Sequence, residues 1–238
     1  MMPSTDPMNP TGSMPPRTSL TFGIVAVLAV VAAQAFSIFT SPAEGDMGHL
    51  QKIMYVHVPA AWMAFISFFV VLVYSVRYLW RKDENDDLLA ASAAEVGAVF
   101  TGLTLALGMI WGRPAWGVWW VWDARLTSTL VLFLIFVGYL ALREFVDDAS
   151  QRARWSAAVG AIGAINVPIV YMSVKWWRTL HQPPSSPETL DPAYTMGLRI
   201  NAIAFLLLTI YFIRKRYEIA RLDRAAEHLA ESAAMGGR

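Results

Sequence analysis

Residues 58–80 read VPAAWMAFISFFVVLVYSVRYLW, a run in which Arg77 is the single charged residue. About twenty predominantly apolar residues form a helix long enough to cross the hydrocarbon core of a bilayer. Five further runs of this kind lie on either side of it, at 20–39, 88–111, 126–142, 155–176 and 196–213. The sequence therefore predicts an all-α integral membrane protein with six transmembrane helices, in contact with the lipid bilayer along most of its length.

The composition supports this fold class and excludes several functions. Of the 238 residues, 56% are hydrophobic and 16% are charged, which is unusual for a soluble domain of this size. The absence of cysteine removes disulfides, thiolate metal ligands and any covalent thioether attachment of haem to this chain. The formal net charge is +1, and the basic residues are spread along the chain, so no nucleic acid partner is expected.

The chain divides into three parts. Residues 1–19 are rich in Pro, Ser and Met and are expected to form a disordered leader. Residues 20–213 form a single six-helix membrane domain, and residues 214–238 form a charged helical tail. With both termini cytoplasmic, thirteen of the nineteen Lys and Arg residues lie on the inner side, as the positive-inside rule requires. The alternative for the first run is a cleaved signal peptide, which leaves the sides of the later loops unchanged.

The most unusual stretch is WGRPAWGVWWVWDARLT at 111–127, in the predicted outer loop between the third and fourth helices. It holds five of the ten tryptophans of the chain: Trp111, Trp116, Trp119, Trp120 and Trp122. If the stretch were helical, Trp116, Trp119 and Trp122 would share one face. We expect Gly112, Pro114 and Gly117 to interrupt any helix at the start of this stretch. The stretch is interpreted as a platform for a large planar ligand; the alternative is an ordinary interfacial belt of indoles.

Three charged residues accompany these tryptophans. Arg113 and Arg125 carry guanidinium groups suited to carboxylates at the edge of such a ligand. Asp123 either caps the fourth helix, or accepts a hydrogen bond from an indole N–H or from Arg125. These residues complete the candidate ligand platform.

Two histidines share the side of the membrane on which the tryptophans lie. His57 directly precedes the second helix and His181 follows the fifth, so the order of the spans puts both on the outer face. Neutral imidazoles are good metal ligands, and two of them beside an aromatic bed predict a haem site with two axial histidines. His49 and His228 lie in a polar loop and in the tail, and neither is expected to bind metal.

Two polar features interrupt the spans themselves. Glu95 lies within the third run, where an ionisable side chain marks either a polar route for haem or a hydrogen bond to a neighbouring helix, such as one to Asn166. Pro168 is expected to kink the fifth helix.

Residues 111–129 resemble the tryptophan-rich WWD signature of membrane proteins that handle haem during cytochrome c maturation. Together with the six runs and the segments 55–62 and 176–182, they are similar over roughly residues 20–213 to the haem exporter protein C family, CcmC. The leader and the tail beyond Arg216 lie outside this resemblance.

The resemblance implies that His57 and His181 hold haem b non-covalently as its axial ligands. It implies that Trp116, Trp119, Trp120, Trp122 and Asp123 present the haem, with Trp111 beside them. It further implies a bacterial inner membrane location and delivery of haem to a membrane-tethered periplasmic haem chaperone. The expected partners are that chaperone, an ABC-type ATPase with its membrane subunit, and a small single-span membrane subunit. No enzymatic activity is expected of this chain. The alternative function is a bis-His b-type cytochrome that transfers electrons.

Overall fold

The computed structural model describes residues 18–183 and 190–236. The predicted disordered leader, 1–19, therefore lies outside the described residues except for its last two. The described chain is helical throughout its regular structure, in the order α1 (Leu20–Thr40), η1 (His49–Ile53), α2 (Met54–Arg81), α3 (Glu84–Trp116), α4 (Ala124–Phe145), α5 (Ala149–Gly163), α6 (Asn166–Trp176) and α7 (Pro192–Gly236).

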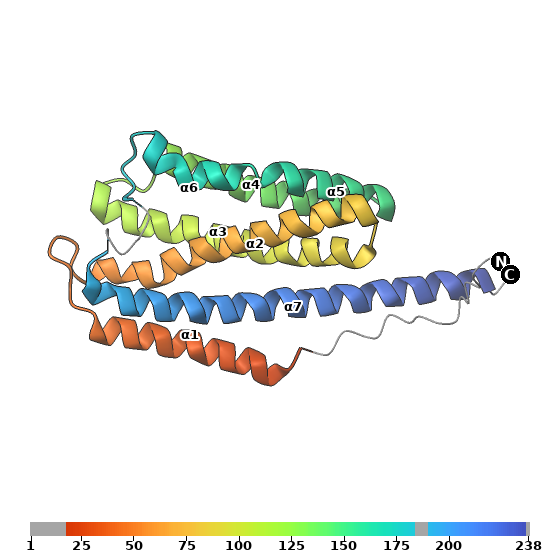
Figure 1. Ribbon diagram of the computed structural model, residues 1–238, viewed down its shortest axis with the longest axis horizontal. Helices are drawn as coiled ribbons and strands as arrows, with labels where there is room; N and C mark the ends of the chain where they lie inside the picture. The colour runs from red at the N-terminus through yellow and green to blue at the C-terminus, as the bar shows by residue number, and fades with distance from the viewer. Residues whose placement is uncertain (1–17, 184–189, 237–238) are drawn as a thin grey trace.

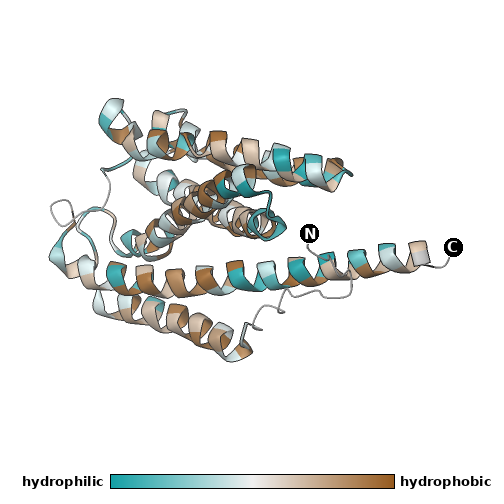
Figure 2. Cartoon of the chain, turned by 45° about the vertical axis from the view of Figure 1, so that its right-hand side comes forward, coloured by the Kyte–Doolittle hydropathy of each residue, from teal (hydrophilic) through white to brown (hydrophobic). Residues whose placement is uncertain are grey.

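Six helical spans are long and apolar enough to cross a bilayer, which confirms the predicted number. The fifth of them consists of α5 and α6 in succession. Apolar residues dominate the helices of the bundle, whereas polar residues alternate along the end of α7 that projects beyond it (Figure 2). Residues 214–236 of the expected tail accordingly continue the sixth span, in one helix that begins at Pro192 and ends at Gly236.

The helices form three layers (Figure 1). α2 and α3 make up the middle layer and pack closely against each other. α1 and α7 lie side by side on one face of this pair, and α4, α5 and α6 cover the other face. Because the connections after α2 and after α4 are short, neighbouring helices run antiparallel, and the starts of α2 and α4 lie at the same end of the bundle as the end of α3.

The third helix is longer than the sequence predicted. It continues through Gly112 and Pro114 to Trp116, so the expected interruption at these two residues is wrong. Gly117 ends the helix with φ +80°, and its N–H donates to the carbonyl of Arg113 at 3.0 Å. A left-handed residue of this kind commonly closes an α-helix, and glycine adopts it without a steric penalty.

The fifth span is broken at Ala164 and Ile165, between α5 and α6. Pro168 has no N–H to donate to the carbonyl of Ala164, four residues earlier. The N–H of Val167 reaches that carbonyl instead, at 3.2 Å, in a tighter turn. The helix is thus interrupted one turn before Pro168, in the span for which the sequence predicted a kink.

A second proline leaves a helix carbonyl without its usual donor, and a side chain of another helix donates to that carbonyl instead. Pro59 lies in the second turn of α2 and leaves the carbonyl of Tyr55 without its helical donor. The side-chain amide of Gln34, in α1, donates to this carbonyl at 2.9 Å and to Asn201 of α7 at 2.7 Å. Since an unpaired carbonyl is costly in a bilayer, the Gln34 amide fixes α1 and α7 against the start of α2.

Buried and half-buried ion pairs hold the opposite end of the bundle. Arg143 of α4 forms a bidentate pair with Asp87 of α3, with N–O distances of 2.6 and 2.8 Å. Glu95 of α3 pairs with Arg216 of α7. The interpretation of Glu95 as a contact with a neighbouring helix is confirmed, but Asn166 is not its partner. The Asn166 amide donates to the carbonyl of Ser128 instead.

Candidate functional site

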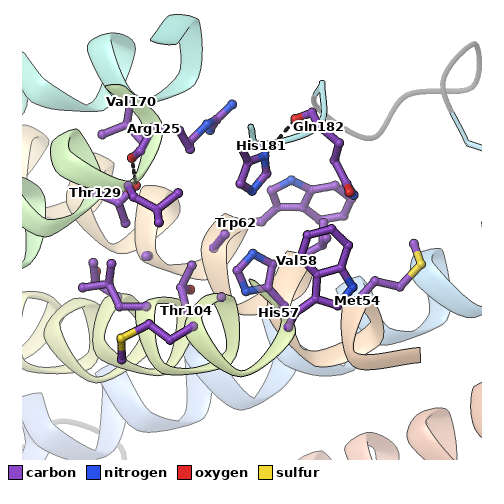
Figure 3. A pocket seen from close by; sticks show the side chains of 18 of the residues that line it. Met54, His57, Val58, Trp62, Thr104, Arg125, Thr129, Val170, His181 and Gln182 are labelled. Atoms are coloured by element: carbon purple, nitrogen blue, oxygen red, sulfur yellow. Dashed lines mark hydrogen bonds between the residues drawn. The ribbon is translucent and has the colours of Figure 1, made fainter. Parts of the chain in front are cut away.

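A cavity opens at the end of the bundle where α2 and α4 begin and α3 ends. Its volume is about 1240 Å³ when its open mouth is included. Side chains from α2, α3, α4, α6 and the segment after α6 converge on it (Figure 3). The walls are mainly apolar, and the polar groups are few. The residues that matter most below are Met54, His57, Trp62, Phe65, Thr104, Trp111, Trp116, Trp120, Arg125, Thr129 and His181.

Two imidazoles face each other in this cavity. His57 lies in the first turn of α2, and His181 lies in the non-helical segment after α6. Their ring centroids are 6.3 Å apart, and the ring planes make an angle of 32°. Two metal–nitrogen bonds of about 2.0 Å, with about 1.1–1.2 Å from each nitrogen to its ring centre, put two imidazoles roughly 6.2–6.4 Å apart across one metal ion. The spacing therefore fits two axial ligands of a single iron.

Hydrogen bonds set the state of His181. Its Nδ1 lies 2.8 Å from the carbonyl oxygen of Gln182, which can only accept, so Nδ1 is the protonated nitrogen. Nε2 then carries the free lone pair, which is the arrangement usual for a metal-ligating histidine. Burial lowers the pKa of His181, although the Gln182 carbonyl opposes the shift. The imidazole is accordingly neutral at pH 7 and available to a metal.

Asp123 ties the tryptophan stretch to the segment that carries His181. One carboxylate oxygen caps α4 by accepting from the N–H of Leu126 at 2.8 Å. The other accepts from the hydroxyl of Thr179 and from the N–H of Leu180. Thr179 in turn accepts from the N–H of His181 at 3.0 Å. The expected cap is confirmed, and the partners of the second oxygen are Thr179 and Leu180 rather than an indole or Arg125.

The five tryptophans divide into two groups. Trp111, Trp116 and Trp120 line the cavity. Trp119 and Trp122 point outward and are 58% and 76% exposed. The prediction that Trp116, Trp119 and Trp122 share a helical face is wrong, because α3 ends at Trp116 and the chain is not helical again until Ala124.

The two arginines also differ in whether they line the cavity. Arg125 lines the cavity, and its guanidinium donates to the carbonyl of Tyr171 at 3.4 Å. Arg113 is exposed and does not line the cavity; its guanidinium donates to the carbonyl of Gly117 at the end of its own helix. The structure therefore places Arg125 at the candidate site and Arg113 at a helix terminus.

Three buried polar atoms of the cavity residues have no hydrogen-bond partner within 18–183 and 190–236. They are His57 Nδ1, Trp120 Nε1 and Arg125 Nε. Unpaired polar groups are expensive in a largely apolar environment. An occupant that offers carboxylate oxygens to the indole and the guanidinium removes most of this cost, so the donors suit an amphiphilic ligand that carries acidic groups.

Sequence reasoning missed several residues of the site. Trp62 and Thr104 line the cavity from α2 and α3, and Thr179 holds the His181 segment. Trp62 follows His57 by five residues, about 140° around an α-helix, so helical spacing alone does not put both on one side of α2. Nothing in the spacing of Thr179 indicates its contact with Asp123, because these residues lie 56 positions apart.

The fold and the site define an all-helical, membrane-spanning protein with a paired-imidazole cavity, lined by indoles, at one end of its bundle. Residues 9–230 match the family model described as Heme exporter protein C, CcmC. The chain belongs to this family. It is thus a multi-pass membrane protein of haem export in cytochrome c biogenesis, a transport component and not an enzyme.

Relatives extend over most of the chain. "Heme exporter protein C" of Bradyrhizobium diazoefficiens is 42% identical over 202 residues, which are 82% of this chain and 77% of that protein. The protein of the same name from Escherichia coli K12 is 36% identical over 219 residues, which are 90% of this chain and 89% of that one. A "Putative cytochrome c biosynthesis ccmC-like mitochondrial protein" of Marchantia polymorpha is 41% identical over 187 residues, which are 77% and 79% of the two chains.

Proposed function

We propose that the chain binds one haem b non-covalently between His57 and His181 and presents it at the periplasmic face of the bacterial inner membrane. The observation that carries this proposal is the 6.3 Å separation of the two ring centroids. That value falls within the range calculated above for two imidazoles on one iron. The iron supplies the bonds to the two imidazoles, and the protein supplies orientation and a largely apolar enclosure.

The polar groups of the cavity orient this cargo. Arg125 and Thr129 lie on the side of the cavity formed by α4, next to Val170 of α6 (Figure 3). A propionate directed to this side would accept from the Arg125 Nε, which has no protein partner in the described chain. Arg113 does not line the cavity, and its guanidinium donates to the carbonyl of Gly117 instead. The apolar vinyl edge of the porphyrin would then face the indoles of Trp111 and Trp116.

The outward tryptophans suit a protein partner. Trp119 and Trp122 are exposed in the loop that also carries the cavity residue Trp120, and large exposed indoles are typical of interaction surfaces. We assign them to contact with a membrane-tethered haem chaperone, which would take the haem covalently. By the same family relationship, the chain would work with an ABC-type ATPase, its membrane subunit and a small single-span subunit. The sidedness follows from the charge distribution, with both termini in the cytoplasm.

Absorption spectroscopy of the purified protein from haem-replete cells tests the ligand pair. Wild-type protein is expected to show a low-spin, six-coordinate spectrum. His57→Ala and His181→Ala should each lose haem or become five-coordinate, and His49→Ala, which changes a histidine outside the cavity, is the matched control. Unchanged spectra in both cavity variants would refute the assignment.

The alternative, an electron-transferring cytochrome, needs histidine pairs at two depths so that electrons can cross the bilayer. The two remaining histidines lie at opposite ends of the bundle: His49 begins η1, next to the start of α2, and His228 lies near Glu84 at the start of α3. The four histidines of the chain therefore provide a single pair, which favours presentation of haem over electron transfer across the membrane.

A further inference from the structure

An apolar groove runs between α2 and α7 on the outside of the bundle. Its walls are formed by Trp62, Phe65 and Ile66 of α2 and by Ala202, Ile203 and Leu206 of α7. Ile203 is 62% exposed, and its neighbour across the groove, Ile66, is also exposed. Exposed apolar side chains at the middle of a membrane span face lipid. The groove is therefore open to the acyl chains of the bilayer.

This groove and the histidine cavity share a wall. Trp62 and Phe65 line both of them. Along α2 these residues lie five and eight positions beyond His57, or about 7.5 and 12 Å towards the membrane interior. An indole and a phenyl ring are thus the partition between a lipid-facing groove and the space beside the paired imidazoles.

The chemistry of the groove fits a flat apolar ring system. All its lining residues are apolar, so it offers nothing to a lipid headgroup or to another charged group. A porphyrin is a large planar macrocycle that dissolves in a bilayer, and an aromatic partition can stack on its face while it passes. The polar donors that would recognise its carboxylates lie further in, at Arg125 and Trp120.

We propose that the α2–α7 groove is a lateral portal through which an iron porphyrin passes from the bilayer into the cavity, with Trp62 and Phe65 as its gate. This inference rests on the proposed haem site. It concerns the route by which the cargo arrives, whereas the ligand pair concerns where the cargo is held.

The test follows uptake of haem by the full-length protein in proteoliposomes. Vesicles that carry haem in their bilayer are mixed with the apo-protein, and the rise of the low-spin Soret band is followed by stopped flow. Ala202→Trp fills the groove without touching the cavity, and should slow uptake at least tenfold while leaving the final spectrum and the dissociation constant unchanged. Phe65→Ala removes a phenyl ring from the wall between the groove and the cavity, and should accelerate haem uptake. Phe69→Trp is the control for an added indole outside the groove, because Phe69 is 65% exposed on α2 and does not line the groove.

The outcomes separate the two proposals. An unchanged uptake rate in Ala202→Trp would show that haem does not pass through the groove, and would refute the proposed portal. Equal slowing by Phe69→Trp would also overturn it, since the effect would then not depend on the groove. If Ala202→Trp fails to insert, Leu206→Phe replaces it as the filling variant. A wild-type protein that acquires no low-spin spectrum would instead overturn the haem site itself.

Discussion

Thr179 holds one of the two proposed iron ligands in place, and its replacement by valine isolates that contribution. The Thr179 hydroxyl donates to the Asp123 carboxylate and accepts from the N–H of His181. Thr179→Val keeps the shape of the side chain and removes both bonds. The carboxylate retains its contact with the Leu180 N–H at 3.2 Å, so the segment is loosened rather than released.

The magnitude follows from these two bonds. A hydrogen bond to a charged group contributes about 1.5–3 kcal/mol, and the partial exposure of this segment reduces that to roughly 1–2 kcal/mol. Such a loss corresponds to a dissociation constant for haem about 5–30 times larger than that of the wild type. The final spectrum at saturating haem should stay six-coordinate, because both imidazoles are still present.

The assay is a titration of detergent-solubilised apo-protein with haem, read at the Soret band. Thr179→Ser keeps the hydroxyl and should bind nearly as tightly as the wild type. The reasoning fails if Thr179→Val binds haem with wild-type affinity, or if its saturated spectrum becomes five-coordinate like the one expected for His181→Ala.

Three further predictions concern packing, the polar contact of α1, and pH. Gly97→Ala would drive a methyl group into the ring of a packed phenylalanine and should cost about 1–3 kcal/mol, seen as a lower apparent melting temperature, whereas Gly138→Ala enters open space and should not lower it. Gln34→Leu leaves the Tyr55 carbonyl unpaired in the bilayer and should destabilise the bundle by about 1–2 kcal/mol. The loss should be smaller in a Pro59→Ala background, because the residue at position 59 then has an N–H that can donate to this carbonyl. Equal losses in the two backgrounds would contradict this explanation. Because burial lowers the pKa of His181, protonation of its imidazole should compete with iron only at pH values below about 6.5. The low-spin spectrum should therefore persist at pH 6.5 and decline in more acidic buffer. Loss of the spectrum between pH 8 and 7 would contradict this prediction.

Hydropathy and span order were sufficient to predict much of the architecture. Six long apolar runs predicted six spans, and an alternating path through the membrane predicted that His57 and His181 lie at the same end. Pro168 indicated a disturbance of the fifth span, where the helix is interrupted, since the missing N–H is a local property of the chain. These features depend on residue type and sequence order, which a single sequence contains in full.

Contacts between distant segments could not be read in this way. The three-residue spacing of the tryptophans at 116, 119 and 122 predicts a shared face only in a helix, but Gly117 ends α3. Trp119 and Trp122 are exposed. The partner of Glu95 proved to be Arg216, 121 positions away, because α7 packs against α3. Helical spacing gives the direction of a side chain from its own axis, and only the packing of the bundle decides what lies there.

The two imidazoles rest on supports of unequal stiffness. His57 belongs to a helix in the middle layer of the bundle, so shifting it means unwinding a turn or dislodging packed neighbours. His181 sits on irregular backbone fastened by a few side-chain hydrogen bonds, which together amount to only a few kcal/mol. If the proposed haem site is correct, the segment that carries His181 would yield more easily than the helical turn that carries His57. An acceptor that took the haem would then displace the His181 imidazole before the His57 imidazole.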